Sequence, residues 1–210
     1  VMVATTWDAI EKYRRHANTD PLTNLLNRRG LDALLLSSRG RQFRSEPTAV
    51  ILADIDDFKA INDRFGHPFG DTVIVRFGAL LKVHAGPHGC VVRLGGEEFG
   101  VLLPGVPLDD AIAVADMMRR IFQAERWSQN GITGQFTASF GVTLVKDRES
   151  VAAAIERADH LLYDAKRAGR NRVVGQHGLS LDTEDDRQAF AEESARHHVP
   201  PRRAANENAR

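Results

Sequence analysis

The chain of 210 residues contains one cysteine, no net charge and no long apolar run. A single cysteine excludes a disulfide framework and suits the reducing cytoplasm, where we expect the protein to reside. Lysine plus arginine and aspartate plus glutamate both number 28, so no overall charge favours binding to nucleic acid. No apolar run approaches the roughly 20 residues that cross a bilayer, so we expect no membrane contact from this segment. Cys90 lies within an apolar run and is predicted to be a small buried residue.

Hydrophobic residues make up 42% of the chain and charged residues 27%, which is typical of an ordinary globular domain. The continuous apolar run at 49–53 predicts a central strand over 48–55 that is covered on both faces. Short helices are expected over 58–65 and from Asp71 or Thr72 to about His84, with a break at 67–70 between them. Helical and extended patterns alternate around one hairpin, which indicates an α+β fold, an α/β sandwich with a mixed central sheet covered by helices.

Three segments are expected along the chain. Residues 1–18 are predicted to form an N-terminal connecting helix stub, with a frayed terminus as the alternative. The folded domain is expected over 19–175. Residues 176–210 are polar and are predicted to form a disordered tail, because they bury too little apolar surface to offset the cost of ordering. Within the domain, the helix that follows Asp109 is expected to turn five apolar side chains inward: Ile112, Ala115, Met118, Ile121 and Phe122.

The stretch 93–99, Arg-Leu-Gly-Gly-Glu-Glu-Phe, places two glycines and two carboxylates between apolar runs. Such a pattern predicts a β-hairpin with both acids near its tip. Carboxylates beside a glycine turn can hold Mg²⁺, although a solvated turn would have the same sequence. Asp54 follows the central strand, and neighbouring strands lie about 4.8 Å apart. If this strand adjoins the hairpin, Glu97 is expected to face Asp54 across the sheet and to share a metal ion with it.

Several further blocks occur in a fixed order. They are 20–28, 54–63, Gly66 with His67, Gly70 with Asp71, 93–99, 139–142 and 158–171. Together they resemble the GGDEF family of diguanylate cyclases, here with a GGEEF variant, from about Asp20 to Val174. The resemblance implies a palm-like nucleotidyl cyclase fold with a catalytic β-hairpin.

The resemblance also implies an enzyme that joins two GTP molecules into cyclic di-GMP, a bacterial second messenger, and releases pyrophosphate. The site would be shared across a head-to-head homodimer, because a monomer cannot complete both bonds. An upstream sensory domain is implied if the chain is a fragment. The alternative is a catalytically weak module that acts as a receptor for GTP or cyclic di-GMP.

Residue roles follow from the resemblance position by position. Asp54, the carbonyl of Ile55, Glu97 and Glu98 would bind Mg²⁺ or Mn²⁺. Glu97 is also the candidate base, although metal activation of the attacking hydroxyl is physically sufficient. Lys59 would stabilise developing charge on the phosphates, with a solvated helix lysine as its alternative.

The same resemblance assigns the nucleotide contacts. Asn62 and Asp71 would bind guanine, with a helix N-cap as the alternative for Asp71. His67 would support the base pocket. Gly95 and Gly96 would leave space for the α-phosphate. Lys166 and Arg170 would bind the γ-phosphate, and the alternative for these two cations is that they only complement a helix dipole.

Two features depart from a plain match. Arg93 is interpreted as a sheet-edge residue rather than a catalyst. Many family members carry an Arg-x-x-Asp motif that binds product and inhibits the enzyme, and residues 86–89, Gly-Pro-His-Gly, stand in its place. We therefore expect that tight product inhibition through that position is lost.

Overall fold

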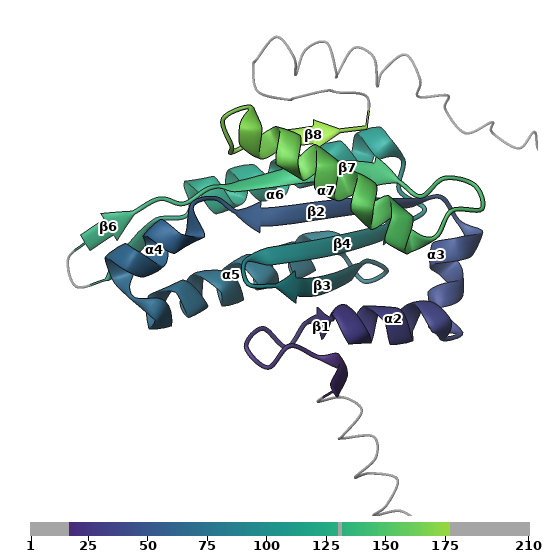
Figure 1. Ribbon diagram of the computed structural model, residues 1–210, viewed down its shortest axis with the longest axis horizontal. Coiled ribbons are helices and arrows are strands. Elements are labelled where there is room, and N and C mark those ends of the chain that lie inside the picture. The colour runs from purple at the N-terminus through teal and green to yellow at the C-terminus, as the bar shows by residue number, and fades with distance from the viewer. Residues whose placement is uncertain (1–16, 130–131, 177–210) are drawn as a thin grey trace, which may run out of the picture.

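The computed structural model describes residues 17–129 and 132–176, which form one six-stranded mixed sheet with helices on both faces (Figure 1). The expected α+β sandwich is therefore confirmed. The two outermost pairings are parallel and the three inner ones are antiparallel. In spatial order the strands are β1 (Leu26–Asn27), β3 (Cys90–Gly95), β4 (Glu98–Pro104), β2 (Thr48–Ile55), β7 (Ala138–Leu144) and β8 (Val173–Gly175).

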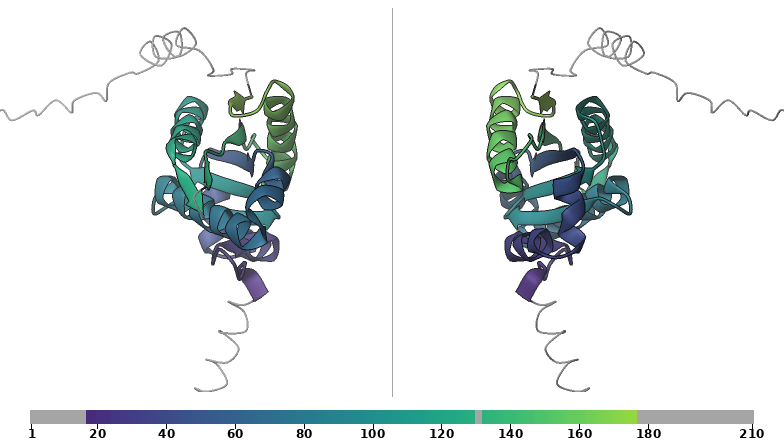
Figure 2. Two further views of the ribbon diagram at one scale, coloured as in Figure 1. Left: turned by 90° about the vertical axis from the view of Figure 1, so that its left-hand side faces the viewer. Right: turned by 90° about the vertical axis from the view of Figure 1, so that its right-hand side faces the viewer.

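Helices cover the sheet as two layers, which Figure 2 shows with α7 in green on one side and α6 in teal on the other. One hydrophobic cluster joins the sheet to α4, α5 and α6, and a second joins it to α2, α3 and α7. The helices are α2 (Arg28–Leu36), α3 (Gln42–Ser45), α4 (Phe58–Phe65), α5 (His67–Ala85), α6 (Leu108–Ala124) and α7 (Val151–Arg167), with a 3₁₀ turn η1 (Arg39–Arg41) and a small hairpin of β5 (Trp127–Gln129) and β6 (Ile132–Gly134).

Strand β2 has the predicted bounds, and all eight of its residues are buried. It lies between β4 and β7 and pairs with both along nearly its whole length, so neither backbone edge is exposed. Alternate side chains enter the two clusters, with Ile51 on the α5–α6 side and Leu52 on the α2–α7 side. The period of two places Asp54 on the α2–α7 side, at the carboxyl end of the strand.

The expected break at 67–70 is wrong, because α5 begins at His67 rather than at Asp71 or Thr72. Gly66 ends α4 with φ 85 and also caps α5, so the two helices meet at one residue. Pro68 lies in the first turn of α5, where its missing N–H has no helical partner to lose.

The predicted inward face of helix α6 is confirmed except for Ile121, and it also includes two charged residues that were not predicted. Ile121 is 40% exposed, whereas Asp116 and Arg119 are only 4% and 6% exposed. The other four predicted inward residues are buried. Charged residues on a helix are ordinarily read as solvent-facing, so periodicity alone missed this buried pair.

Some predictions fall at the ends of the chain. The helix stub expected over 1–18 lies outside the described residues except for Ala17 and Asn18, which are helical. The tail expected over 176–210 lies outside them except for Gln176. Within the described ranges, no helix combines the length and the apolar character that crossing a membrane requires.

Candidate active site

Four chain segments meet at one edge of the sheet. They are the carboxyl end of β2, the tip of the β3–β4 hairpin, the start of α4 and the carboxyl end of α7, at the left of the sheet in Figure 1. Most of the acids and bases predicted for the site lie on these segments. The antiparallel register explains the meeting, since β2 and β4 run in opposite directions and β4 starts where β2 ends.

Asp54 is the buried centre of this edge, with 4% exposure. Its Oδ2 lies 2.8 Å from Nζ of Lys166, on the last turn of α7. Burial raises the pKa of Asp54 to about 6, and the negative charges of Glu97 and Glu98 act in the same direction, although Lys166 opposes them. Asp54 therefore pairs with one amine and lies within the electrostatic influence of two further carboxylates.

The predicted pairing of Glu97 with Asp54 is wrong, because Asp54 is directly opposite Glu98. An irregularity between Arg93 and Gly95 shifts the hairpin register so that Gly95 pairs with Glu98. Glu97 consequently occupies the turn with Gly96, where it still contributes to the electrostatic field at Asp54.

The two turn glycines leave room at the hairpin tip. Gly96 has φ 45, which favours glycine, whereas Gly95 has an ordinary φ. A Cβ added at either residue would meet no atom within 4 Å. Packing within the described protein therefore gives no reason for glycine at Gly95, and the open space beside it is available to a ligand.

Arg93 braces this turn, a role that its interpretation as a plain sheet-edge residue did not include. Its Nε and Nη2 donate to the carbonyl oxygen of Gly96 at 2.9 and 2.7 Å, and its Nη1 donates to Asp20 Oδ1 at 3.0 Å. Burial alone would raise the pKa of Asp20, but hydrogen bonds from Thr23 and Arg93 outweigh it and hold that pKa below its usual value. The acid of the first motif is thus tied to the glycine turn.

The predicted guanine contacts lie on α4 and α5. Asn62 Oδ1 is buried and has no hydrogen-bond partner among the described residues. A Cβ at Gly70 would lie 2.0 Å from that oxygen, so glycine is required there to leave Asn62 in place. Asp71 is exposed and lies beyond the first turn of α5, whose N-cap is Gly66, so its alternative role as an N-cap is wrong. His67 and Lys59 are exposed nearby on α5 and α4.

The two predicted phosphate ligands both reach acids beside β2. Lys166 binds Asp54, and Arg170 Nε lies 3.3 Å from Oδ1 of Asp57, the residue that precedes α4. Arg170 itself lies past the end of α7 with φ 63. The two cations therefore pair with two different acids at the carboxyl end of β2 and just past it, and their shared role as phosphate ligands stays a prediction.

A family model described as the diguanylate cyclase GGDEF domain matches residues 17–172. The chain belongs to the GGDEF family. Its GGDEF domain is 38% identical over 165 residues to the diguanylate cyclase DgcP of Pseudomonas aeruginosa and 37% identical over 173 residues to VdcA of Vibrio cholerae. These matches cover 78% and 80% of this chain but only 25% and 49% of the two relatives, so the chain spans from a quarter to a half of their length.

Solved structures agree with this assignment. The coiled coil and GGDEF domain of DgcB from Caulobacter crescentus, in complex with c-di-GMP, superposes with a TM-score of 0.76 and 31% identity over 83% of this chain and 93% of that one. The active GGEEF domain of a diguanylate cyclase from Vibrio cholerae gives a TM-score of 0.65 and 33% identity over 72% and 97%. The GGDEF fold is therefore shown from both sequence and structure.

The carboxylates of this GGDEF domain fit part of a magnesium site. Within the described ranges, no group of three or more His, Cys, Asp or Glu side chains is arranged to hold a metal ion. Asp54, Glu97 and Glu98 nevertheless offer oxygen donors whose charges repel one another. Mg²⁺ takes few protein ligands and completes its shell with phosphate oxygens and water, so this donor set suits a metal that arrives with a nucleotide.

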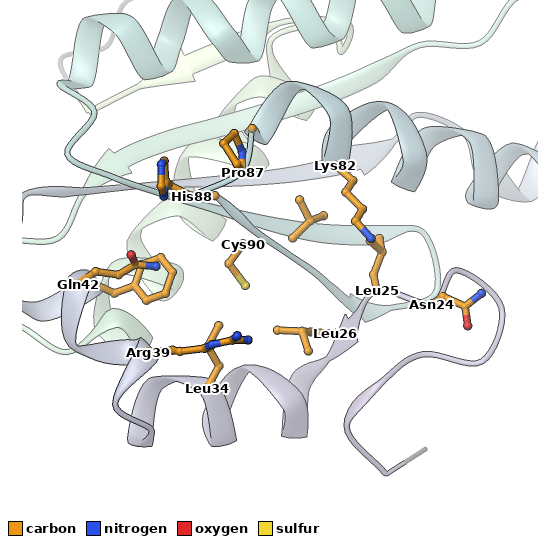
Figure 3. A pocket seen from close by; sticks show the side chains of 14 residues that line it. Asn24, Leu25, Leu26, Leu34, Arg39, Gln42, Lys82, Pro87, His88 and Cys90 are labelled. Atoms are coloured by element: carbon orange, nitrogen blue, oxygen red, sulfur yellow. The ribbon is translucent and has the colours of Figure 1, made fainter. Parts of the chain in front are cut away.

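A hollow lies away from the carboxyl end of β2, between α2, η1 and the turn that leads into β3. It has a volume of about 740 Å³, and Figure 3 shows Arg39, Lys82 and His88 around Cys90. None of the described residues that line it is an aspartate or a glutamate. Cys90 is buried as predicted, and burial raises its pKa to about 11, so the thiol stays protonated at neutral pH. The turn at 86–89 that replaces the family's Arg-x-x-Asp motif forms one wall.

Proposed function

We propose that this GGDEF domain is a diguanylate cyclase that converts two GTP into one cyclic di-GMP and two pyrophosphates. The observation that carries the proposal is the buried Asp54, which faces Glu98 on a glycine hairpin whose tip leaves open space. Family membership and the activity in the printed names of its relatives support the same reaction.

In this proposal Asp54, the carbonyl of Ile55, Glu97 and Glu98 hold Mg²⁺ or Mn²⁺. When bound, the ion offsets the charge of the triphosphate and makes the attacking 3′-hydroxyl more acidic. Glu97, in the turn, is the candidate acceptor for the hydroxyl proton.

The guanine base is assigned to the buried Asn62 oxygen and to Asp71. A buried acceptor without a partner is costly, and this amide would remove that cost by turning toward the base to accept a guanine N–H. An ionised Asp71 can accept from both the ring N–H and the exocyclic amine of guanine, a donor pair that adenine lacks. His67 would border the base. These contacts predict a strong preference for GTP over ATP.

The triphosphate is assigned to the hairpin tip and the end of α7. Gly95 and Gly96 let the α-phosphate approach the backbone, because no side chain fills that space. Lys166 and Arg170 would turn from Asp54 and Asp57 to the γ-phosphate, and Lys59 would stabilise charge that develops on the phosphates. Asp54 keeps a counter-charge in the nucleotide-free protein through Lys166.

One subunit presents one such site, whereas the product contains two new phosphodiester bonds. Each 3′-hydroxyl must attack the α-phosphate held by the other subunit and release pyrophosphate. Product formation is therefore expected to need a head-to-head homodimer and to rise more steeply than linearly with protein concentration.

The test is incubation of the purified chain with GTP and Mg²⁺ over a range of protein concentrations, followed by chromatography of the nucleotides. We expect cyclic di-GMP and pyrophosphate in a one-to-two ratio, and none from ATP. Glu97→Gln should remove product, whereas Glu125→Gln, a glutamate paired with Arg76 away from the site, should not. GTP binding without product at any concentration would instead favour the receptor alternative.

A further inference from the structure

Two turns beside the carboxyl end of β2 have unusual backbone conformations. Asp57, which precedes α4, has φ 51, and Arg170 and Asn171, which follow α7, have φ 63 and 48. Aspartate and asparagine adopt this region more readily than arginine does. Such conformations persist where surrounding contacts over-determine them, so the position of Arg170 requires support from outside its own turn.

Asp56 supplies the first part of that support from the end of β2. Its carboxylate is buried and accepts hydrogen bonds from the hydroxyls of Thr137 and Ser139, both at 2.7 Å. Oδ2 also accepts the backbone N–H of Asn171 at 3.0 Å. The strand end and the turn that carries Arg170 are therefore fixed to each other through one carboxylate.

Arg119 supplies the second part from α6. Its Nη1 donates to Oδ1 of Asn171 at 2.9 Å. Its Nε and Nη2 both donate to Oδ1 of Asp116, at 2.9 and 2.8 Å, which fixes the plane of the guanidinium group. The side chain of Asn171 is thus held by a group from α6, which packs on the face of the sheet opposite to α7.

The buried pair of Asp116 and Arg119 is poorly explained by stability alone. Desolvation of two charges offsets most of their attraction, so such a pair contributes little net stability. The rigid fork of a guanidinium group, however, is well suited to fixing a partner at a set distance and angle. The Nη1 group that Asp116 leaves free donates to Asn171, next to the proposed phosphate ligand, and at 3.1 Å to Oε1 of Gln123 on the same helix.

We propose that Asp116, Arg119, Asn171 and Asp56 act as positioning residues that hold Arg170 toward the carboxyl end of β2. Through Arg170 they set the preference of the site for a nucleoside triphosphate over a diphosphate. The inference rests on the proposed function, in which Arg170 binds the γ-phosphate. None of the four touches the substrate, so their effect passes entirely through Arg170.

The test compares the affinities of the full 210-residue chain for 3′-deoxy-GTP and 3′-deoxy-GDP in Mg²⁺, since neither nucleotide has the hydroxyl needed for condensation. Arg170→Ala should lower the triphosphate preference about tenfold, the usual scale for one charged hydrogen bond. Arg119→Gln and Asn171→Gly should each lower it about fivefold. Glycine at 171 tolerates the positive φ, so this second variant removes the acceptor without adding strain.

Arg120→Gln is the matched control. Arg120 Nε also donates to Asp116, at 2.6 Å, from the same helix, but its side chain is 47% exposed and has no bond to Asn171. This variant should keep the triphosphate preference. In the double variant with Arg170→Ala, the Arg119→Gln change should have no additional effect on that preference.

Two results would overturn the inference alone: a folded Arg119→Gln or Asn171→Gly variant that keeps the wild-type preference, or an effect of Arg119→Gln that adds fully to that of Arg170→Ala. A lower melting temperature with unchanged preference would assign these residues to stability. A wild-type chain that binds neither nucleotide would overturn the proposed function and this inference with it. If Arg119→Gln does not fold, Asn171→Gly decides the question.

Discussion

Helix α7 carries a cation near each of its ends, and the two cations meet very different acids. Near the amino end, Arg157 Nη2 donates to Glu149 and to the carbonyl oxygen of Leu144, at 2.8 and 2.6 Å, and Arg157 Nε donates to Thr143 Oγ1 at 2.9 Å. Near the carboxyl end, Lys166 lies 2.8 Å from the buried Asp54. The two pairs lie near opposite ends of the paired strands β2 and β7.

The pKa values of the two acids are shifted in opposite directions. Hydrogen bonds from Arg157 and from the backbone of Lys146 lower the pKa of Glu149 to about 2. Burial, together with Glu97 and Glu98, raises the pKa of Asp54 to about 6 despite its amine partner. The Glu149 pair is therefore a stabilising contact, whereas Asp54 carries an under-compensated charge that a cationic ligand can relieve.

The largest expected effect comes from neutralising Asp54. Asp54→Asn should lower the rate of cyclic di-GMP formation at least about 100-fold, the scale seen when an electrostatic stabiliser is removed from an active site. It should not lower the melting temperature at pH 7, because the substitution removes a buried charge. Product assays and thermal unfolding in parallel measure both, and the control is Asp110→Asn at an exposed position of α6. Retained activity would place the metal site elsewhere.

The pH dependence of stability should separate the two acids next. The pKa of Asp54 is raised from 3.8 to about 6, so the folded state binds more protons than the unfolded state between these values. The contribution of Asp54 to stability therefore falls as pH rises through that window, by roughly 2 kcal/mol. In the presence of a chelator, the free energy of unfolding of Asp54→Asn should rise by about that much relative to wild type between pH 4 and 7.

The contribution of Glu149 to stability should depend on pH with the opposite sign, because its folded-state pKa is lowered. Its stabilising contribution is full above about pH 4.5 and is lost as pH falls toward 2. Glu149→Gln should therefore be destabilised at neutral pH, and its deficit relative to wild type should shrink in acid. Denaturant unfolding across pH 3–7 measures both slopes. Parallel pH profiles for the two variants would contradict the contrast between the acids.

The sequence predicted those features that depend on local pattern. The apolar run from Ala49 to Ala53 identified β2 with its correct bounds, and the glycine turn identified the hairpin. It could not predict which glutamate faces Asp54, because that depends on the register between β2 and β4, which no local pattern reports. A difference of one residue in that register exchanges the two faces of a strand, and the regular pairing of β2 with β4 places Glu98 opposite Asp54.

Long-range polar contacts were beyond the sequence for a different reason. Arg119 belongs to a helix whose pattern predicted only an apolar inward face, and Asn171 lies far along the chain. A hydrogen bond between such residues depends on how α6 packs on the sheet, which no local pattern reports. The arginine bracing the hairpin was missed for the same reason, since its partner Asp20 comes from the first motif.

Two glycines, one at the hairpin tip and one under α7, extend the comparison, and the expected effect on activity is smaller than that of Asp54→Asn. Gly95 has open space around it, whereas a Cβ at Gly141 would lie 2.2 Å from the carbonyl oxygen of Ala158 on α7. Gly95→Ala should leave the melting temperature unchanged but raise the KM for GTP about tenfold. Gly141→Ala should lower stability by roughly 3 kcal/mol, since helix and strand must separate. A destabilised Gly95→Ala variant would mean that this glycine serves folding rather than substrate.

Cations without any acid complete the comparison, and there we expect the smallest effect. Arg39 and Lys82 line the hollow beside the turn at 86–89, where the described lining contains no carboxylate. Cations alone attract phosphates but do not read a guanine edge, which needs an acceptor such as aspartate. Cyclic di-GMP should therefore not inhibit at micromolar concentration, and Arg39→Ala with Lys82→Ala should leave the initial rate and the progress curve unchanged. Micromolar inhibition that the double variant relieves would show that the hollow recognises the product through its cations and apolar walls, and the expected loss of product inhibition would be wrong.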